Sequence, residues 1–310
     1  MSKQLFYSAL VRYAALDKWW GSFNKEARLV ILAYHRICPH SQMKSVLKEI
    51  AVEPEMFDQQ ISFSNKKFNI LPLESAINCF FNETNKNSNC LAITFDDAYE
   101  DSYTYAFPIL KKYNVPATIL VPTSYIETGE KFWWEELAEK ANSRAFLNHS
   151  NSLKFQPRDK QRATLRELES GQVSIPKTLS WSQMQEMEHA GISFGAHSST
   201  HSVFSRLSEN EIQNEIIESK NILISKLKNP VNIFAFPYGE KDDFNEFSKE
   251  AVKKAGFLAA LTMVQGINTK EDDLYSLKRI GVGGLDTMET FRLKIAGFIP
   301  WLSQLKSYVV

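Results

Sequence analysis

The sequence LAITFDDAYED, residues 91–101, combines a strand pattern with the beginning of a functional site. The apolar run Leu91 to Phe95 lies between a polar stretch and acidic residues, which predicts a buried strand that delivers its last residues to a site. Successive side chains of an extended chain point to opposite faces. Asp96 and Asp97 are therefore expected to have different roles, unless the chain turns there.

A second segment, HSSTH at residues 197–201, also follows an apolar strand-like run. Its histidines stand four apart, and one helical turn would bring both imidazoles to one face. Asp97, His197 and His201 then make a set of two nitrogens and one carboxylate with an open position, which is typical of catalytic zinc. The expected cofactor is a divalent metal ion, with zinc as the first choice, and Asp96 is left free to act as general base in amide hydrolysis.

Each segment has a simpler interpretation when it is taken singly. A DD pair is common in solvated turns and caps, and an HxxxH spacing also occurs by chance. Both segments follow strand-like runs, however, and sites on α/β barrels lie at the carboxyl ends of strands. Their joint occurrence therefore favours a metal-dependent hydrolase.

Two further strand-like runs end in residues that fit this site. NIFAFPYGE, residues 232–240, enters a turn where Pro237 and Tyr238 can meet substrate and the Tyr238 backbone N–H can form an oxyanion hole. On spacing alone, an ordinary strand-to-turn transition is an equal interpretation. RLVILAYHRI, residues 28–37, places His35 directly after a strand, where a structural histidine is the simpler interpretation of that motif alone.

The order of the elements predicts the fold class. Strand-like runs alternate with helical patterns, which favours a distorted (β/α) barrel of about seven mostly parallel strands. Capping boxes mark the starts of two crossover helices, at Ser208 with Glu211 and at Ser180 with Gln183. The predicted strands are residues 29–34, 91–96, 117–121, 192–196, 232–236, 257–263 and 277–282.

The expected catalytic domain covers residues 28–290, after an N-terminal helical segment at 1–27 and before an amphipathic tail at 291–310. Residues 1–27 lack an uninterrupted apolar run with a small-residue cleavage site, so the expected location is cytoplasmic. Both ends are basic and bear tryptophan, which suits peripheral contact with the inner membrane, although such ends more often pack on the domain. Lys plus Arg equals Asp plus Glu at 36 each, so no bulk charge recruits nucleic acid.

A polar span at about residues 125–178 interrupts the alternation and is predicted to be an insertion over the site. It contains helical patterns at 131–147 and 158–170. Trp133 and its neighbour Trp134 are candidates for a sugar-stacking wall. Tryptophan in an amphipathic helix usually packs into the core, so at least one of the two is expected to pack.

The ordered set AYHRI, TFDDAYED, PATILVP, LSWSQMQEMEHAGISFGAHSSTH, FAFPYGE and LKRIGV resembles the polysaccharide deacetylase family, carbohydrate esterase family 4. The resemblance implies a general base at the first Asp of TFDD, metal ligands at the second Asp and the two histidines, and an oxyanion-hole amide in the Pro-Tyr segment. Matched residue by residue, these are Asp96, then Asp97, His197 and His201, then Tyr238.

The sequence departs from the family pattern at two positions, so other residues are expected to supply the cation beside the base and the general acid. The Arg of the common RPPY motif is absent, and Arg279 is the candidate to supply a cation beside Asp96, which would favour the ionised carboxylate. The C-terminal motif that carries the general-acid His is also absent. Tyr34-His35 resembles the N-terminal YH motif of a branch that includes biofilm poly-N-acetylglucosamine deacetylases, so His35 is the expected acid.

The expected activity is hydrolysis of the acetamide of an N-acetylated amino sugar. The substrate is a polysaccharide or, for an intracellular enzyme, its nucleotide- or lipid-linked precursor in surface-polysaccharide assembly. Two alternatives remain: a deacylase of a formyl or cyclic amide on the same fold, and an inactive carbohydrate-binding relic. The intact ligand set argues against the relic.

Overall fold

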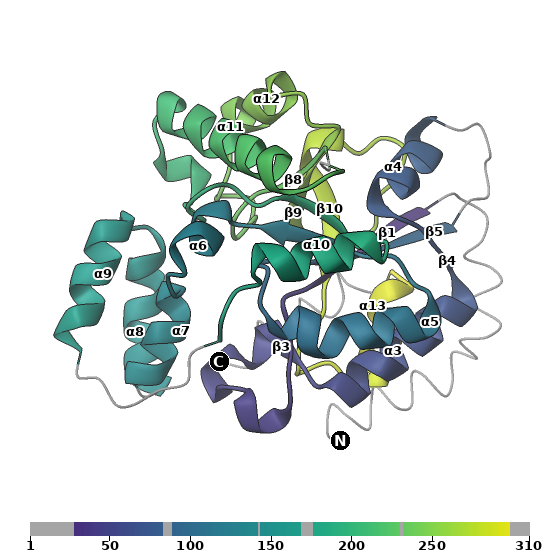
Figure 1. Ribbon diagram of the computed structural model, residues 1–310, viewed down its shortest axis with the longest axis horizontal. Coiled ribbons are helices and arrows are strands. Elements are labelled where there is room, and N and C mark those ends of the chain that lie inside the picture. The colour runs from purple at the N-terminus through teal and green to yellow at the C-terminus, as the bar shows by residue number, and fades with distance from the viewer. Residues whose placement is uncertain (1–27, 83–88, 142, 169–175, 230–231, 298–310) are drawn as a thin grey trace.

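Seven parallel strands close into a barrel in the computed structural model, which describes residues 28–82, 89–141, 143–168, 176–229 and 232–297 (Figure 1). The order around the barrel is β5-β6-β7-β8-β9-β10-β1, and β1 pairs with β5 to close it. The strands are β1 (Arg28–Tyr34), β5 (Asn89–Phe95), β6 (Thr118–Val121), β7 (Ser193–Ala196), β8 (Ile233–Ala235), β9 (Ala259–Gln265) and β10 (Leu277–Gly281). All seven match the predicted runs, so the predicted fold class is confirmed.

Three two-residue strands were not predicted from the sequence. β4 (Asn69–Ile70) extends the sheet from β5, while β2 (Arg36–Ile37) and β3 (Ala51–Val52) pair with each other. Two-residue strands carry too little alternation to be recognised in a sequence.

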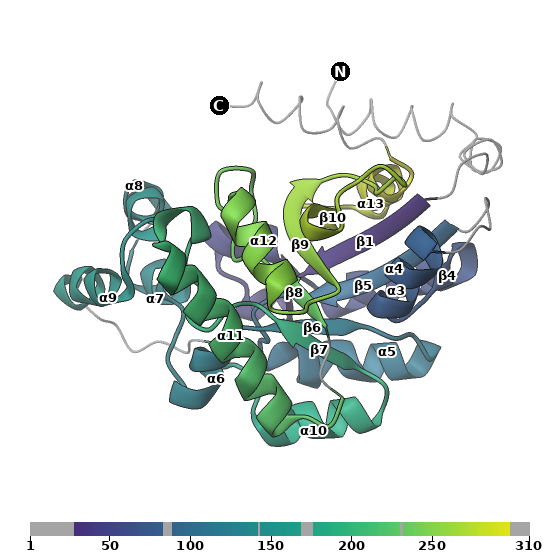
Figure 2. The same cartoon turned by 90° about the horizontal axis from the view of Figure 1, so that it is seen from above.

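Helices surround the barrel (Figures 1 and 2). They are α3 (Pro54–Lys67), α4 (Leu73–Asn82), α5 (Phe107–Tyr113), α10 (Trp181–His189), α11 (Glu209–Lys226), α12 (Glu246–Lys254) and α13 (Met288–Ile295). Short helical turns lie at η2 (His40–Gln42), η3 (Ser45–Ile50), η4 (Ser102–Ala106), η5 (Phe204–Arg206) and η6 (Leu274–Ser276). Both predicted capping boxes are present, at Ser180 before α10 and at Ser208 before α11.

Alternating strand residues divide between two apolar clusters, as the two-residue period of a strand requires. On β1, Leu29 and Ile31 pack with residues of the other strands and α4, whereas Val30 and Leu32 belong to the cluster under the surrounding helices. The inward register of β5 continues through Thr94 to Asp96, so the barrel interior becomes polar at the carboxyl ends of its strands. This polar layer positions the site.

The predicted insertion forms α6 (Thr123–Thr128), α7 (Trp133–Lys140), α8 (Ser143–Lys154) and α9 (Arg158–Glu167). Helices α7, α8 and α9 lie together at one flank of the barrel in both views (Figures 1 and 2). The single helix predicted over 131–147 is wrong, because α7 ends where Ala141 becomes extended, with φ −108° and ψ 141°.

The expected chain ends fall largely outside the described residues, which begin at 28 and end at 297. The expected boundary at 290 lies within α13, whose Phe291, Leu293 and Ile295 are buried. Among the described residues, no helix combines the length and apolar character needed to cross a membrane.

Candidate active site

Three buried side chains converge at the carboxyl ends of β5 and β7. Asp97, His197 and His201 each offer one ligand atom, and these atoms lie within 4.8 Å of one another. The nearest carboxylate oxygen, Asp97 Oδ1, is 3.6 Å from His197 Nε2 and 3.1 Å from His201 Nε2. The structure therefore brings the three predicted ligands together.

The neighbouring carboxylates diverge because the chain turns directly after β5. Asp97 has φ +69° and Ala98 has φ +51°, a left-handed conformation that costs a non-glycine residue about 1–2 kcal/mol. Asp96 keeps the inward register of the strand, whereas Asp97 is displaced towards the histidines. The turn thus gives two adjacent carboxylates different surroundings.

The histidine segment is not the helical turn that the spacing predicted. Ser198 and His201 are left-handed, with φ +61° and +57°, and the two imidazole centroids lie 4.8 Å apart. Glu215 of α11 explains this shape, because its carboxylate accepts hydrogen bonds from the Ser199 and Thr200 amides at 2.9 and 2.8 Å. A side chain from the next crossover helix therefore replaces the hydrogen bonds of a helix.

The donor set fits a divalent cation. His197 Nδ1 lies 2.9 Å from the Ala235 carbonyl, so this nitrogen carries the proton and Nε2 presents its lone pair. Buried Asp97 Oδ1 has no hydrogen-bond partner among the described residues, which is costly unless an ion satisfies it. Burial lowers the pKa of His197, and lowers that of His201 to about 4, so both imidazoles are neutral at pH 7, as metal ligation requires.

Asp96 is held by Arg279 inside the barrel. Arg279 Nη1 and Nη2 each lie 2.7 Å from one Asp96 oxygen, while Nε donates to the Thr262 carbonyl at 2.8 Å. Burial alone would raise the pKa of Asp96, but the Arg279 guanidinium holds it well below its ordinary range. The structure thus places Arg279 beside Asp96 in a bidentate ion pair.

His35 follows β1 and lies next to Asp96, with Nε2 3.9 Å from Asp96 Oδ2. This closeness arises because β1 and β5 are paired neighbours in the closed barrel. Its side chain is 18% exposed, against 2–5% for the other site residues that it faces. Burial lowers the pKa of His35, although Asp96 and Asp97 oppose that shift.

The turn after β8 brings Pro237 and Tyr238 to the same site. Gly239 N–H donates to the Pro237 carbonyl at 2.6 Å, which makes a γ-turn centred on Tyr238 at φ +60°. The Tyr238 amide donates no hydrogen bond to another described residue. Its ring centroid lies 4.8 Å from that of His201, so the turn borders the candidate metal ligands.

The two tryptophans of α7 pack against this site, and both are buried. Trp133 Nε1 donates to the Tyr238 hydroxyl at 2.9 Å, and the Trp134 ring centroid lies 4.9 Å from that of His201. Lys154 of α8 places its Nζ 4.8 Å from the Tyr238 ring centroid. Helices α7 and α8 therefore cover one side of the site.

A buried polar network below Trp134 was missed by sequence reasoning. Trp134 Nε1 donates to the Tyr99 hydroxyl, which donates to Glu135 Oε1 at 3.0 Å. Arg36 lies 3.7 Å from the same oxygen of Glu135 and donates to Asp101 at 2.8 Å. Burial raises the pKa of Glu135 to about 7, against the opposing effect of Arg36. The only sequence signal was a glutamate at a buried α7 position, which a helical pattern alone does not single out.

Comparisons with known proteins identify the family. The family model described as polysaccharide deacetylase matches residues 83–260. The relative named "Putative polysaccharide deacetylase YxkH" from Bacillus subtilis (strain 168) is 25% identical over 263 residues, which are 85% of this chain and 74% of that protein.

Solved structures share the fold. The Streptococcus pyogenes deacetylase PplD in complex with acetate matches with a TM-score of 0.66 and 24% identity, over 87% of this chain and 99% of that one. IcaB from Ammonifex degensii matches with a TM-score of 0.61 and 20% identity, over 88% of this chain and 97% of that one.

The first prediction concerns the three ligands. The double variant His197→Ala/His201→Ala should lose tight binding of a divalent metal ion, because one carboxylate alone cannot hold the ion. Elemental analysis after dialysis and calorimetric titration with zinc measure this loss. His189→Ala, which removes an exposed histidine of α10, should keep full zinc content. An unchanged zinc stoichiometry in the double variant would refute the site.

The second prediction concerns the buried ion pair. In metal-free protein at pH 7, Arg279→Met should lower the free energy of unfolding by about 3–5 kcal/mol, because Asp96 is left charged and unpaired. The folded pKa of Asp96 is depressed, so the pair stabilises above the unfolded carboxylate pKa of ~3.9 and loses this effect as pH falls. Denaturant titrations should show a smaller deficit at pH 4 and in Arg279→Met/Asp96→Asn. A pH-independent deficit would contradict the assignment.

Proposed function

Since the chain belongs to the polysaccharide deacetylase family, and so is a deacetylase that hydrolyses a carbon–nitrogen bond, we propose that it acts on the acetamide of an N-acetylated amino sugar with Asp96 as base and His35 as acid. One observation carries this assignment. The Asp96 carboxylate, fixed by Arg279, and the partly exposed His35 lie side by side next to the Asp97, His197 and His201 cluster.

The cation that Asp97, His197 and His201 would hold supplies Lewis-acid polarisation and makes water more acidic. Zinc is the proposed ion. Asp96 stays ionised across the neutral range because Arg279 depresses its pKa, and it accepts the proton that the attacking water loses. Both of its oxygens accept from Arg279, so the carboxylate is fixed while it does so.

The acyl carbon gains the water oxygen and loses the sugar nitrogen, which leaves as the amine after His35 donates a proton to it. Burial lowers the pKa of His35, which makes its imidazolium the stronger acid, while Asp96 and Asp97 favour keeping it protonated. The free Tyr238 amide is the proposed oxyanion donor, and Pro237 and Trp133 border the substrate. Trp133 acts here through Tyr238, because its indole is buried and hydrogen-bonded.

The proposal extends to the substrate. We propose a saccharide in surface-polysaccharide assembly, met as a polymer or as a nucleotide- or lipid-linked precursor by a cytoplasmic enzyme at the inner membrane. The polymer and the two precursors differ in size and charge, so a panel of N-acetylated compounds separates them.

The third prediction tests the activity with the base. Zinc-loaded protein should release acetate from at least one of neutral oligomers, nucleotide-linked sugars and lipid-linked sugars. Asp96→Asn should retain zinc and lose about 10²–10⁴-fold in turnover, because it removes a base and not a ligand. Asp242→Asn, an exposed neighbour of the Tyr238 turn, is the matched control and should keep wild-type turnover.

Three outcomes contradict the proposal in different ways. Release of formate, or opening of a cyclic amide, without release of acetate would identify the alternative deacylase. Binding of sugars without any hydrolysis would identify the relic. Loss of zinc from Asp96→Asn together with retention by Asp97→Asn would reverse the two carboxylate roles.

The fourth prediction concerns the acid. His35→Ala should keep zinc and the fold and lose most turnover. Wild-type activity should fall as pH rises through the His35 pKa, which burial places below the ordinary imidazole value, since only the imidazolium donates. The variant's pH–rate profile should lack this alkaline limb. His40→Ala, which changes an exposed histidine on η2, should keep the wild-type profile. Normal turnover in His35→Ala would reject the assignment.

A further inference from the structure

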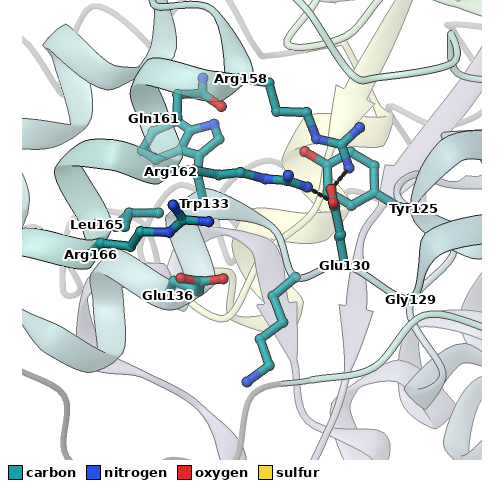
Figure 3. Close-up of a pocket in the computed structure, with 11 residues that line it drawn as sticks. Tyr125, Gly129, Glu130, Trp133, Glu136, Arg158, Gln161, Arg162, Leu165 and Arg166 are labelled. Atoms are coloured by element: carbon teal, nitrogen blue, oxygen red, sulfur yellow. Dashed lines mark hydrogen bonds and ion pairs between the residues drawn. The ribbon is translucent and has the colours of Figure 1, made fainter.

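A cavity of about 390 Å³ lies within the insertion, bounded by α6, α7 and α9 (Figure 3). None of Asp97, His197 and His201 lines it. Its aromatic wall is made by Tyr125 and Trp133. This volume falls in the range of ligand-binding pockets, about 300–1,000 Å³.

The cavity carries an excess of positive charge. Arg158, Arg162 and Arg166 stand four residues apart along α9 and line the same cavity, as that spacing on a helix allows. With Lys131 they make four cations, against the two carboxylates of Glu130 and Glu136 that also line it.

The carboxylates leave part of this charge unpaired. Glu130 lies between Arg158 and Arg162 and forms an ion pair with each, drawn as dashed lines in Figure 3. Neither Lys131 nor Arg166 forms an ion pair within the described part of the chain. The ion pairs with Glu130 show that the guanidinium groups of α9 can bind an oxyanion. Lys131 and Arg166 remain available to pair with a ligand.

The cavity and the proposed active site share a wall. Trp133 lines the cavity and donates its indole N–H to Tyr238, whose ring contacts His201. Arg158 Nη1 donates to Ser124 Oγ at 2.8 Å, and the Ser124 amide donates to the Ser199 carbonyl at 2.9 Å. The lining of the cavity is thus connected to the Tyr238 turn through Trp133 and to the segment at residues 197–201 through Ser124.

We propose that this cavity binds an anionic group of the substrate, a sugar carboxylate or phosphate attached to the N-acetylated unit. The inference rests on the proposed function, because the adjoining site takes the acetamide. A neutral sugar gains nothing from the charges of Lys131 and Arg166, whereas an oxyanion can pair with them.

The fifth prediction uses zinc-loaded Asp96→Asn protein, in which binding can be measured without turnover. Calorimetry compares a neutral N-acetylglucosamine tetramer with a hyaluronan tetrasaccharide, which bears carboxylates, and with N-acetylglucosamine 1-phosphate. At least one anionic probe should bind more tightly than the neutral tetramer by on the order of tenfold. Adding Arg166→Glu should reduce this ratio to about one, and which anion is preferred identifies its source.

Arg144→Glu is the matched control, since it makes the same charge change at an exposed position of α8 that does not line the cavity. It should keep the preference. Equal affinity for all probes in the parent protein, a preference that survives Arg166→Glu, or the same loss in Arg144→Glu would each overturn the inference. Acetate release by the wild-type enzyme tests the proposed function separately, so the two can fail independently.

Discussion

The buried ion pair of Arg279 with Asp96 is the constraint on which the rest of the site depends. Burying a guanidinium completely, as here, costs several kcal/mol of folding free energy unless its donors are hydrogen-bonded. Asp96, directly after β5, accepts two of its hydrogen bonds, and the Thr262 carbonyl of β9 and Thr94 Oγ1 of β5 accept two more. One side chain of β10 therefore fixes a carboxylate across the closed barrel, and removing either charge would strand the other.

Because Asp96 is fixed, the difference between the two adjacent carboxylates arises from the backbone. Left-handed residues follow three of the strands, at Asp97 after β5, at Ser198 and His201 after β7, and at Tyr238 after β8. Such conformations persist where surrounding contacts enforce them, and they cluster at functional sites. Here Glu215 holds the amides after Ser198, and the Ala235 carbonyl orients His197. The strands bring these residues to one end of the barrel, and the turns after them set where their side chains point.

Much of this arrangement follows from the sequence, since all seven barrel strands and the three converging ligands come from motifs read along the chain. A four-residue histidine spacing, however, could not reveal that Glu215 shapes the segment, because that contact joins separate elements. The same holds for Glu135, whose partners Tyr99 and Arg36 lie more than 35 residues away. Helical periodicity over 131–147 also continued past Ala141, where the backbone becomes extended and ends α7. Local sequence patterns identified the residues at the ends of the strands. Hydrogen bonds between elements far apart in the sequence determine how those residues are oriented.

The buried network below Trp134 anchors the insertion to the barrel. Glu135 of α7 faces Arg36 from β2 and Tyr99 from the turn after β5, so its carboxyl group gains these two partners only when the helix is docked. In the docked helix α7, Trp134 packs against His201, and Trp133 lies between Tyr238 and the cavity lined by α9. The candidate catalytic residues thus lie on the barrel, whereas the proposed anion-binding cavity lies among the helices of the insertion. Sites on a common scaffold diverge through such additions, and the proposed binding of an anionic saccharide assigns that difference to the insertion.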